Sequence, residues 1–201
     1  MDLPRVVGAD TSLTATGLAW PHGEVITHGR AGLTAFTTDP GTRAHNLGDL
    51  AGELHARILN GPAGFDGRLP QLVVLEGIPT SGTKVDSERC YLWWRLVELL
   101  HETDTPVLVV PPTTLKLYAT SFGSANKREV IAACNQLLPQ WETRKTGKRG
   151  NVLDTPDDNK VDAVWLMAIG CHLLGHPLVA VTPYRERALE KLTLPPGIRM
   201  S

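Results

Sequence analysis

Two short apolar runs in this sequence each end in an acidic residue, and this pattern constrains the fold more than any other feature. Residues 6–9 precede Asp10, and residues 72–75 precede Glu76. Apolar runs without polar alternation predict strands that are covered on both faces of a sheet. Carboxylates just past such strands are poorly solvated and repel one another, so they persist together only where a cation neutralises them. The pattern predicts a sheet whose strand ends gather acidic groups around a cation.

The rest of the chain alternates between strand and helix patterns. Further strands are expected over residues 14–20, 24–32 and 107–110. Helical spacing of apolar residues predicts helices over residues 42–60, 87–100, 113–118 and 126–138, and a last long helix from Pro156 or Asp157 to Leu174. The expected fold is α/β, with a mixed sheet flanked by helices. Antiparallel first strands followed by parallel strands resemble the ribonuclease-H-like order.

Length and composition indicate one ordinary globular domain. The 201 residues suffice for a sizeable core, and we expect a domain over residues 1–175 with a peripheral tail over residues 176–201. A short helix is expected near residues 185–192. Apolar content of 42% and charged content of 20% are typical of soluble proteins. We expect a cytoplasmic protein, because the sequence shows neither a membrane-length apolar run nor a signal-peptide core. Three cysteines are expected to be buried free thiols: Cys90, Cys134 and Cys171.

More acidic residues lie at the start of the last long helix. Asp158 and Asp162 are four residues apart, and Asn159 and Asp162 are three apart, so either pair can share one helix face. Asp162 comes where the apolar face begins, which is unusual for an acid that needs only solvent. Asp157 is expected to be structural, because acids near a helix N-terminus interact well with its dipole. Hard oxygen ligands suit Mg²⁺, often as a pair of ions that holds a phosphodiester.

Each acidic position also has a plainer interpretation. Asp10 could accept backbone hydrogen bonds in a turn, and Glu76 could pair with an arginine such as Arg89 or Arg95. A similar turn lies under the nucleotide phosphate in actin-like ATPases. The chain is short and shows no second Asp-Gly-Gly phosphate loop, which argues against that class.

Basic residues cluster near the expected acidic site although the net charge is only −1. Lys116 and Lys127 lie at the end of one expected helix and the start of the next, which could bring both ammonium groups to one edge of the site. Further residues that could hold nucleic-acid phosphates are Arg128, Arg144, Lys145, Lys148 and Arg149. The plainer alternatives are a solvated loop and ordinary surface lysines.

Together these segments resemble the RuvC family of Holliday-junction resolvases over about residues 5–175. The first family motif ends at Asp10, and the second is Leu75-Glu76. The last motif covers residues 158–163, in a form common in phage-type relatives. The most specific likeness is the segment over residues 112–130, which keeps Lys116 and Lys127 at the family spacing.

The resemblance implies a metal-dependent endonuclease. It assigns two ions, Mg²⁺ or Mn²⁺, to the ligands Asp10, Glu76, Asp162 and either Asp158 or Asn159. It also implies that Lys116 and Lys127 contact DNA near the scissile strand. The implied reaction is in-line hydrolysis of a four-way junction by a metal-activated water, with paired symmetric nicks that leave 5′-phosphates.

The sequence departs from the family in two places. Asn159 stands where the family has an acid or a histidine, three residues before Asp162. Ile78 and Pro79 stand where bacterial members carry an aromatic wedge, so the way in which this chain opens a junction is not given by the resemblance. The basic segment at residues 144–149 looks like an insertion that could take over part of the DNA grip.

Family members are two-fold dimers, and the helix at residues 87–100 is apolar almost all round, more than one buried face needs. A dimer contact through this helix is our hypothesis, and a helix packed on both sides within the monomer is the alternative. Two other functions stay open. One is an RNA or RNA–DNA-hybrid nuclease of the same fold. The other is a catalytically weakened nucleic-acid-binding module, which Asn159 favours.

Overall fold

The structure is a computed structural model of the chain, and it describes residues 3–30, 39–61, 65, 67–78, 86–147 and 150–198. Five strands form one mixed sheet in the order β3 (Val25–His28), β2 (Thr16–Ala19), β1 (Val6–Asp10), β4 (Leu72–Glu76) and β5 (Val107–Val110). The pairs β1–β2 and β2–β3 are antiparallel, and the pairs β1–β4 and β4–β5 are parallel. The predicted mixed sheet is therefore confirmed.

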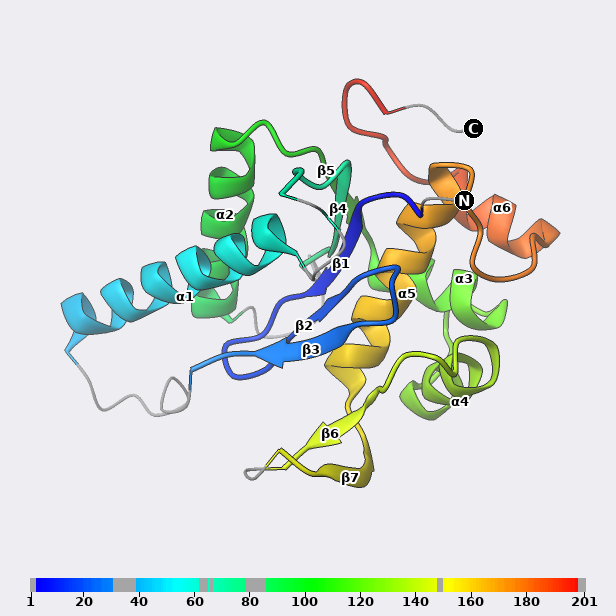
Figure 1. Ribbon diagram of the computed structural model, residues 1–201, viewed down its shortest axis with the longest axis horizontal. Coiled ribbons are helices and arrows are strands. Elements are labelled where there is room, and N and C mark those ends of the chain that lie inside the picture. The colour runs from blue at the N-terminus through cyan, green and yellow to red at the C-terminus, as the bar shows by residue number, and fades with distance from the viewer. Residues whose placement is uncertain are drawn as a thin grey trace.

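Helices cover both faces of this sheet (Figure 1). On one face lie α1 (Pro40–Asn60) and α2 (Ser87–Glu102), which pack against each other. On the other face lie α3 (Pro112–Thr120), α4 (Lys127–Leu137) and α5 (Asp158–Leu173). These helices match the predicted ranges to within a few residues at each end. Among the described residues, no helix is long and apolar enough to span a membrane.

Alternate residues of the central strands face the two helical layers. In β1, Val7 packs with α1 and α2, whereas Val6 packs with the helices of the opposite face. In β4, Val73 and Val74 divide in the same way. All four side chains are fully buried. Both apolar runs are thus covered on both faces, as their lack of polar alternation predicts.

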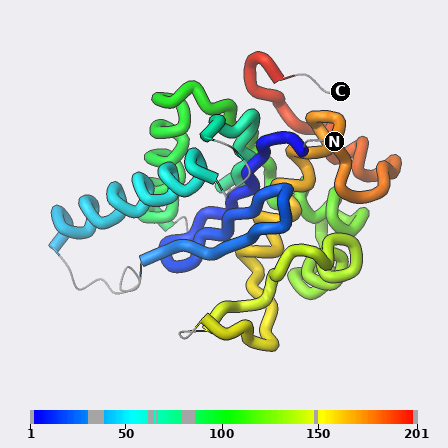
Figure 2. Tube along the Cα trace, viewed as in Figure 1, coloured from blue at the N-terminus to red at the C-terminus, as the bar shows by residue number. Residues whose placement is uncertain are grey.

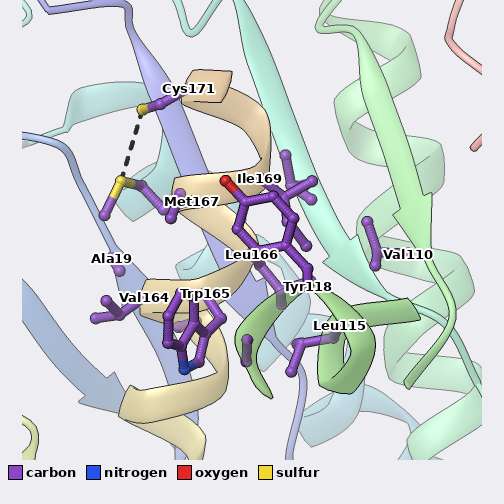
Figure 3. Close-up of a cluster of buried hydrophobic side chains, with 14 of the residues drawn as sticks. Ala19, Val110, Leu115, Tyr118, Val164, Trp165, Leu166, Met167, Ile169 and Cys171 are labelled. Atoms are coloured by element: carbon purple, nitrogen blue, oxygen red, sulfur yellow. Dashed lines mark hydrogen bonds between the residues drawn. The ribbon is translucent and has the colours of Figure 1, made fainter. Parts of the chain in front are cut away.

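Helix α5 is the most buried of the described helices, and its apolar side chains pack with Leu115 and Tyr118 of α3 (Figure 3). Polar contacts also join α5 to its neighbours. Trp165 Nε1 donates to the Val130 carbonyl of α4 at 3.4 Å, and the Tyr118 hydroxyl of α3 lies 3.0 Å from His172 Nδ1. The rings of Tyr118 and Trp165 meet edge to face, with centroids 6.1 Å apart. These contacts satisfy buried polar groups and fix the rotation of α5 on the sheet.

Two glycines allow the α5 backbone to lie directly on the sheet. A Cβ atom at Gly8 of β1 would lie 2.1 Å from the Ala163 carbonyl oxygen, and one at Gly17 of β2 would lie 2.0 Å from the Asn159 carbonyl oxygen. Any larger residue would collide with helix backbone, which cannot rotate away. The close approach brings the first turns of α5 to the end of β1, where Asp10 stands.

The segment between α4 and α5 differs from the prediction. We expected a basic loop there, but β6 (Arg144–Thr146) and β7 (Val152–Pro156) form a hairpin that extends away from the main sheet (Figure 2). Pro156 ends β7, so the last long helix begins at Asp158 rather than at Pro156 or Asp157. Asp157 is the N-cap, and its side chain accepts from the Lys160 amide at 3.4 Å, which confirms its structural role.

The buried ammonium group of Lys160 fixes the hairpin to α5. It donates to the Arg144 carbonyl at 2.8 Å and to the Thr146 hydroxyl at 3.2 Å. Beyond α5, helix α6 (Pro183–Leu189) packs on α3, and the Arg185 Nε atom donates to the Tyr118 carbonyl at 3.1 Å.

The three cysteines are free thiols. Cys134 and Cys171 are buried, as expected, whereas Cys90 is only half-buried. Burial raises the pKa of each buried thiol to about 12, so both are protonated at neutral pH and pack as small apolar groups.

Candidate active site

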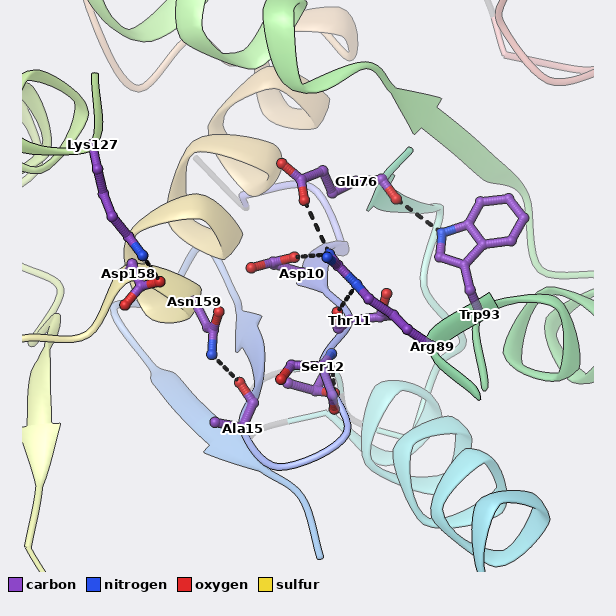
Figure 4. A network of polar contacts seen from close by, with 11 residues as sticks. Asp10, Thr11, Ser12, Ala15, Glu76, Arg89, Trp93, Lys127, Asp158 and Asn159 are labelled. Atoms are coloured by element: carbon purple, nitrogen blue, oxygen red, sulfur yellow. Dashed lines mark hydrogen bonds and ion pairs between the residues drawn. The ribbon is translucent and has the colours of Figure 1, made fainter. Parts of the chain in front are cut away.

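A cavity of about 380 Å³ lies at the carboxyl edge of the sheet. It is lined by four of the acidic residues that the sequence analysis identified. They come from three elements: Asp10 from β1, Glu76 from β4, and Asp158 and Asp162 from α5. Figure 4 shows Asp10 and Glu76 turned toward each other, with the start of α5 beside them. Residues about 150 positions apart in the sequence therefore meet because two parallel strands end together and α5 lies across them.

The neighbouring elements hold the ends of both strands. Asp10 is buried, with 4% of its surface exposed, and pairs in register with Gly17 of β2. Glu76 is paired with Val110 of β5, and its carbonyl accepts a 2.8 Å hydrogen bond from Trp93 Nε1 of α2. These carboxylates therefore project from rigid backbone rather than from mobile loops.

Burial and mutual repulsion disfavour negative charge in this cavity. Burial, followed by the charges of Glu76 and Asp162, raises the pKa of Asp10 well above its usual range, and Arg89 opposes this. Burial, followed by the charges of Glu76 and Asp158, raises the pKa of Asp162 to about 7. Perturbed pKa values of this origin are typical of functional sites that accept a cation or a proton.

One arginine contacts two of the acids. The Nη2 atom of Arg89 lies 3.3 Å from Asp10 Oδ1 and 3.3 Å from Glu76 Oε2, while Nε donates to the Thr11 carbonyl at 2.9 Å. The plainer interpretation of Glu76, an arginine partner, is thus partly realised by Arg89. A single guanidinium offsets only one of the two carboxylate charges. Arg95 pairs instead with Glu98, at 2.6 Å.

The two predicted lysines lie at one edge of the site. An adjoining cavity of about 200 Å³ is lined by the charged residues Lys116, Lys127, Asp158 and Asp162. Lys127 forms an ion pair with Asp158. Burial alone would raise the pKa of Asp158, but the hydrogen bond from Lys127, with the charges of Lys127 and Lys145, holds it below its usual value. The structure thus joins the basic edge directly to the acidic cavity.

Asn159 and Asp158 have different surroundings. The Asn159 amide nitrogen donates to the Ala15 carbonyl at 2.7 Å and so ties α5 to the turn between β1 and β2. Asp158 instead pairs with Lys127, and it lines both cavities. Both residues line the acidic cavity, but only Asp158 carries a negative charge and also lines the adjoining cavity.

The remaining basic residues that were predicted to contact DNA differ in their exposure and pairing. Arg128 is exposed near the start of α4, and Lys145 is exposed on β6, near enough to influence Asp158. Arg144 is paired with Glu142 through bonds of 2.7 and 2.8 Å. The predicted DNA contacts Lys148 and Arg149 lie outside the described residues.

Thr11 also belongs to the site, although the sequence analysis did not identify it as a separate site residue. Its side chain is 1% exposed, and its hydroxyl has no hydrogen-bond partner within the described part of the chain. It also lines the acidic cavity, next to Asp10. A buried hydroxyl without a partner is costly, so it indicates a place for a water molecule, a phosphate oxygen or another polar ligand.

The donor set fits a hard divalent cation. All four acidic side chains offer carboxylate oxygens, and the pKa values of Asp10 and Asp162 are raised first by burial and then by neighbouring carboxylates, which favours a cation there. As the side chains stand, no group of three or more His, Cys, Asp or Glu residues in the described ranges is close enough together to hold a metal ion. Arg89 lies between Asp10 and Glu76, and Lys127 is paired with Asp158.

Comparison with known proteins supports the fold. No family model matches the sequence, and no curated protein matches it. A solved structure of Thermus thermophilus RuvC is similar, with 18% sequence identity, a TM-score of 0.50, and coverage of 83% of this chain and 91% of that chain. A structure of the T. thermophilus protein in complex with a Holliday junction substrate is 19% identical over 83% of this chain and 90% of that chain, with a TM-score of 0.49. At 18% identity the first likeness shows the fold, and the predicted ribonuclease-H-like fold is confirmed.

Proposed function

We propose that this chain is a divalent-metal-dependent endonuclease of the RuvC family and that it cuts four-way DNA junctions. The observation that carries the proposal is the convergence of Asp10, Glu76, Asp158 and Asp162 in one cavity, with Lys116 and Lys127 beside it. The order of the motifs and the shared fold support the family assignment. The substrate follows from that assignment, because the cavity alone would suit any phosphodiester.

The proposed ligands of two Mg²⁺ or Mn²⁺ ions are Asp10, Glu76, Asp158 and Asp162. Ions held there would supply the Lewis-acid charge and the activated water that phosphodiester hydrolysis needs. The rigid strand ends would orient Asp10 and Glu76 before the substrate arrives, which lowers the cost of organising the site. The expected products are symmetric nicks with 5′-phosphates.

The lysines would act on the substrate rather than on the ions. Lys116 and Lys127 line the smaller cavity next to Asp162, where a phosphate between the carboxylates and the lysines would gain charge stabilisation. Lys145 and Arg128 are exposed and free to contact neighbouring phosphates. Arg144 is held by Glu142, so its contribution to binding requires that pair to open.

The dimer proposal concerns the outer face of α2. Its inner face is buried by Leu92, Trp93 and Leu96, whereas Tyr91 and Trp94 are 45% and 62% exposed. Exposed aromatic side chains on one helix face are typical of interfaces, so we propose an isologous contact there. Sedimentation of the protein at micromolar concentration should give twice the chain mass, and a purely monomeric species would remove this proposal.

A second candidate is a binding module that has lost cleavage. Asn159 favours it, because a neutral amide tied to Ala15 replaces an acidic or histidine ligand of the family. An RNA or hybrid nuclease keeps the same site and differs only in substrate. A panel of nucleic acids separates all three functions.

The test is incubation of the wild-type protein and Asp10→Asn with a synthetic four-way junction, a linear duplex and an RNA–DNA hybrid, each with Mg²⁺. We expect paired nicks in the junction alone, and none from Asp10→Asn. Asp104→Asn is the matched control, since it removes an exposed carboxylate at the far end of α2, where a positive φ of 52° suits asparagine. Junction binding without cleavage would favour the binding module, and cleavage of the hybrid alone would reassign the substrate.

A further inference from the structure

We infer that Arg89 is a resident counter-cation of the Asp10–Glu76 pair, which a divalent ion must displace before the site can load. Arg89 would then be a positioning residue that sets the metal concentration at which the protein becomes competent. This inference rests on the proposed function, because it presumes that the carboxylates hold divalent ions.

The inference starts from the position of one nitrogen atom. Arg89 Nη2 lies 3.3 Å from an oxygen of Asp10 and 3.3 Å from an oxygen of Glu76. Figure 4 shows the Arg89 side chain reaching both carboxylates. A cation that bridges two carboxylates from adjacent strands occupies the place that a shared metal ion would take. Mg²⁺ on the same two oxygens would lie at about 2.1 Å from each. The guanidinium would then face a doubly charged ion across the same oxygen atoms, and the like charges would repel strongly.

Local structure aims Arg89 at the site. The Asp86 side chain caps α2 and accepts from the Glu88 and Arg89 amides at 3.1 and 3.4 Å, which fixes the first turn of the helix. One turn later, Trp93 binds the Glu76 carbonyl and holds the same helix against the end of β4. Arg89 therefore reaches the acids from a backbone that is anchored on both sides.

The contacts of Arg89 with the two carboxylates are long, although its Nε atom donates to the Thr11 carbonyl at 2.9 Å. Charge-assisted bonds between nitrogen and carboxylate oxygen are usually about 2.7–2.9 Å long, and both Arg89 contacts exceed this. Its side chain is 34% exposed, so it can leave toward solvent. By contrast, Arg43 binds Glu88 through two of its nitrogens, and its side chain is only 7% exposed. Arg43 has the geometry of a permanent structural pair, and Arg89 has that of a replaceable one.

The experiment measures divalent-ion binding without DNA, by calorimetric titration of MgCl₂ or MnCl₂ at pH 8.5, where protons compete least for the carboxylates. For Arg89→Met we expect at least tenfold tighter binding than for wild type, which is about 1.4 kcal/mol. For Arg89→Lys we expect a gain of about threefold, because an ammonium group cannot reproduce the position of the guanidinium fork. Arg95→Met is the matched control, since it removes an arginine of the same helix that pairs with Glu98, and its affinity should equal that of wild type.

The outcomes separate the inference from the function on which it rests. If the wild-type protein binds the ions and Arg89→Met binds them equally or more weakly, Arg89 is not displaced and the inference is overturned. If neither protein binds a divalent ion, the proposed metal-dependent function fails and the inference fails with it. Circular dichroism checks that each variant is folded. Should Arg89→Met not fold, Arg89→Lys decides, and an affinity equal to that of wild type contradicts the inference.

Discussion

The acidic cavity and the charged cluster between β3 and α1 contain the same kinds of group in opposite balance. In the cluster, Glu53 accepts from Arg30 at 2.5 Å and from His28 at 2.8 Å, and its side chain is 40% exposed. These bonds hold the pKa of Glu53 below its usual value. In the cavity, Asp10 is nearly inaccessible, and its pKa is raised.

A structural ion pair differs from a binding site in the balance of its charges. A solvent-exposed cluster in which each acid is paired with a base has balanced charges and needs no ligand. A buried group of acids with too few bases is costly, and a fold keeps it only where something else supplies the missing charge. We propose that the carboxyl edge of the sheet is of the second kind.

The largest effect is expected from the glycines that bring α5 to the site. Gly17→Ala forces a methyl group to within 2.0 Å of the Asn159 carbonyl oxygen, so we expect a loss of at least about 3 kcal/mol in the free energy of unfolding. Gly52→Ala on α1, beside Glu53, is the matched control, because nothing lies within 4 Å of the added atom. It should stabilise the protein by about 0.5–1 kcal/mol. Chemical denaturation measures both, and a Gly17→Ala protein as stable as wild type would disprove the close seating of α5.

A smaller effect should appear in the pH dependence of stability. The pKa of Asp162 is raised from 3.8 to about 7, so the folded metal-free protein binds a proton that the unfolded chain releases. Its stability should therefore fall as the pH rises from 4 through 7, by roughly 3 kcal/mol, and Asp162→Asn should flatten this slope.

Glu53 should behave in the opposite way. Its pKa is lowered from 4.5, so its contribution is present above that value and is lost as the pH falls through its folded pKa. Glu53→Gln should then lower stability between pH 5 and 8 without changing the slope. Thermal unfolding across this range measures both variants. If the stability of the Asp162→Asn protein depends on pH in the same way as that of the wild-type protein, the pKa of Asp162 is not raised in the folded state.

The smallest effect concerns the lysine at the edge of the cavity. Lys116→Ala should reduce turnover on a four-way junction by about tenfold while junction affinity changes little, because charge stabilisation is lost mainly in the transition state. Arg30→Ala, which removes a base of the wet cluster, should leave turnover unchanged and lower only stability. Single-turnover kinetics and filter binding make the comparison. If Lys116→Ala loses turnover and junction affinity equally, this lysine contributes to DNA binding rather than to transition-state stabilisation.

The sequence predicted the sheet and the helices because their signals are local. The run before Asp10 is apolar without interruption, and the helix boundaries follow from apolar spacing. The β6–β7 hairpin was missed because every residue of both strands is exposed, which leaves no alternation of buried and polar positions. Lys160, which anchors that hairpin from within the last motif, carries no sign of its role in the sequence.

The acids of the site were predictable because strand ends meet at one edge of a parallel sheet. Arg89 was one of two arginines considered as a partner of Glu76, but its additional contact with Asp10 was not predictable, since that contact depends on the rotation of α2. The close packing of α5 on Gly8 and Gly17 was likewise not predictable. A glycine in a strand can have several causes, and the sequence does not say which one applies.

Soaking a crystal of the protein in Mn²⁺ and locating the ions by the anomalous scattering of manganese would show whether the acidic cavity binds metal. We expect peaks within ligand distance of Asp10, Glu76 and Asp162, with the Arg89 guanidinium moved away from the first two. An anomalous map without a peak among these carboxylates, at a Mn²⁺ concentration that supports cleavage, would contradict the account.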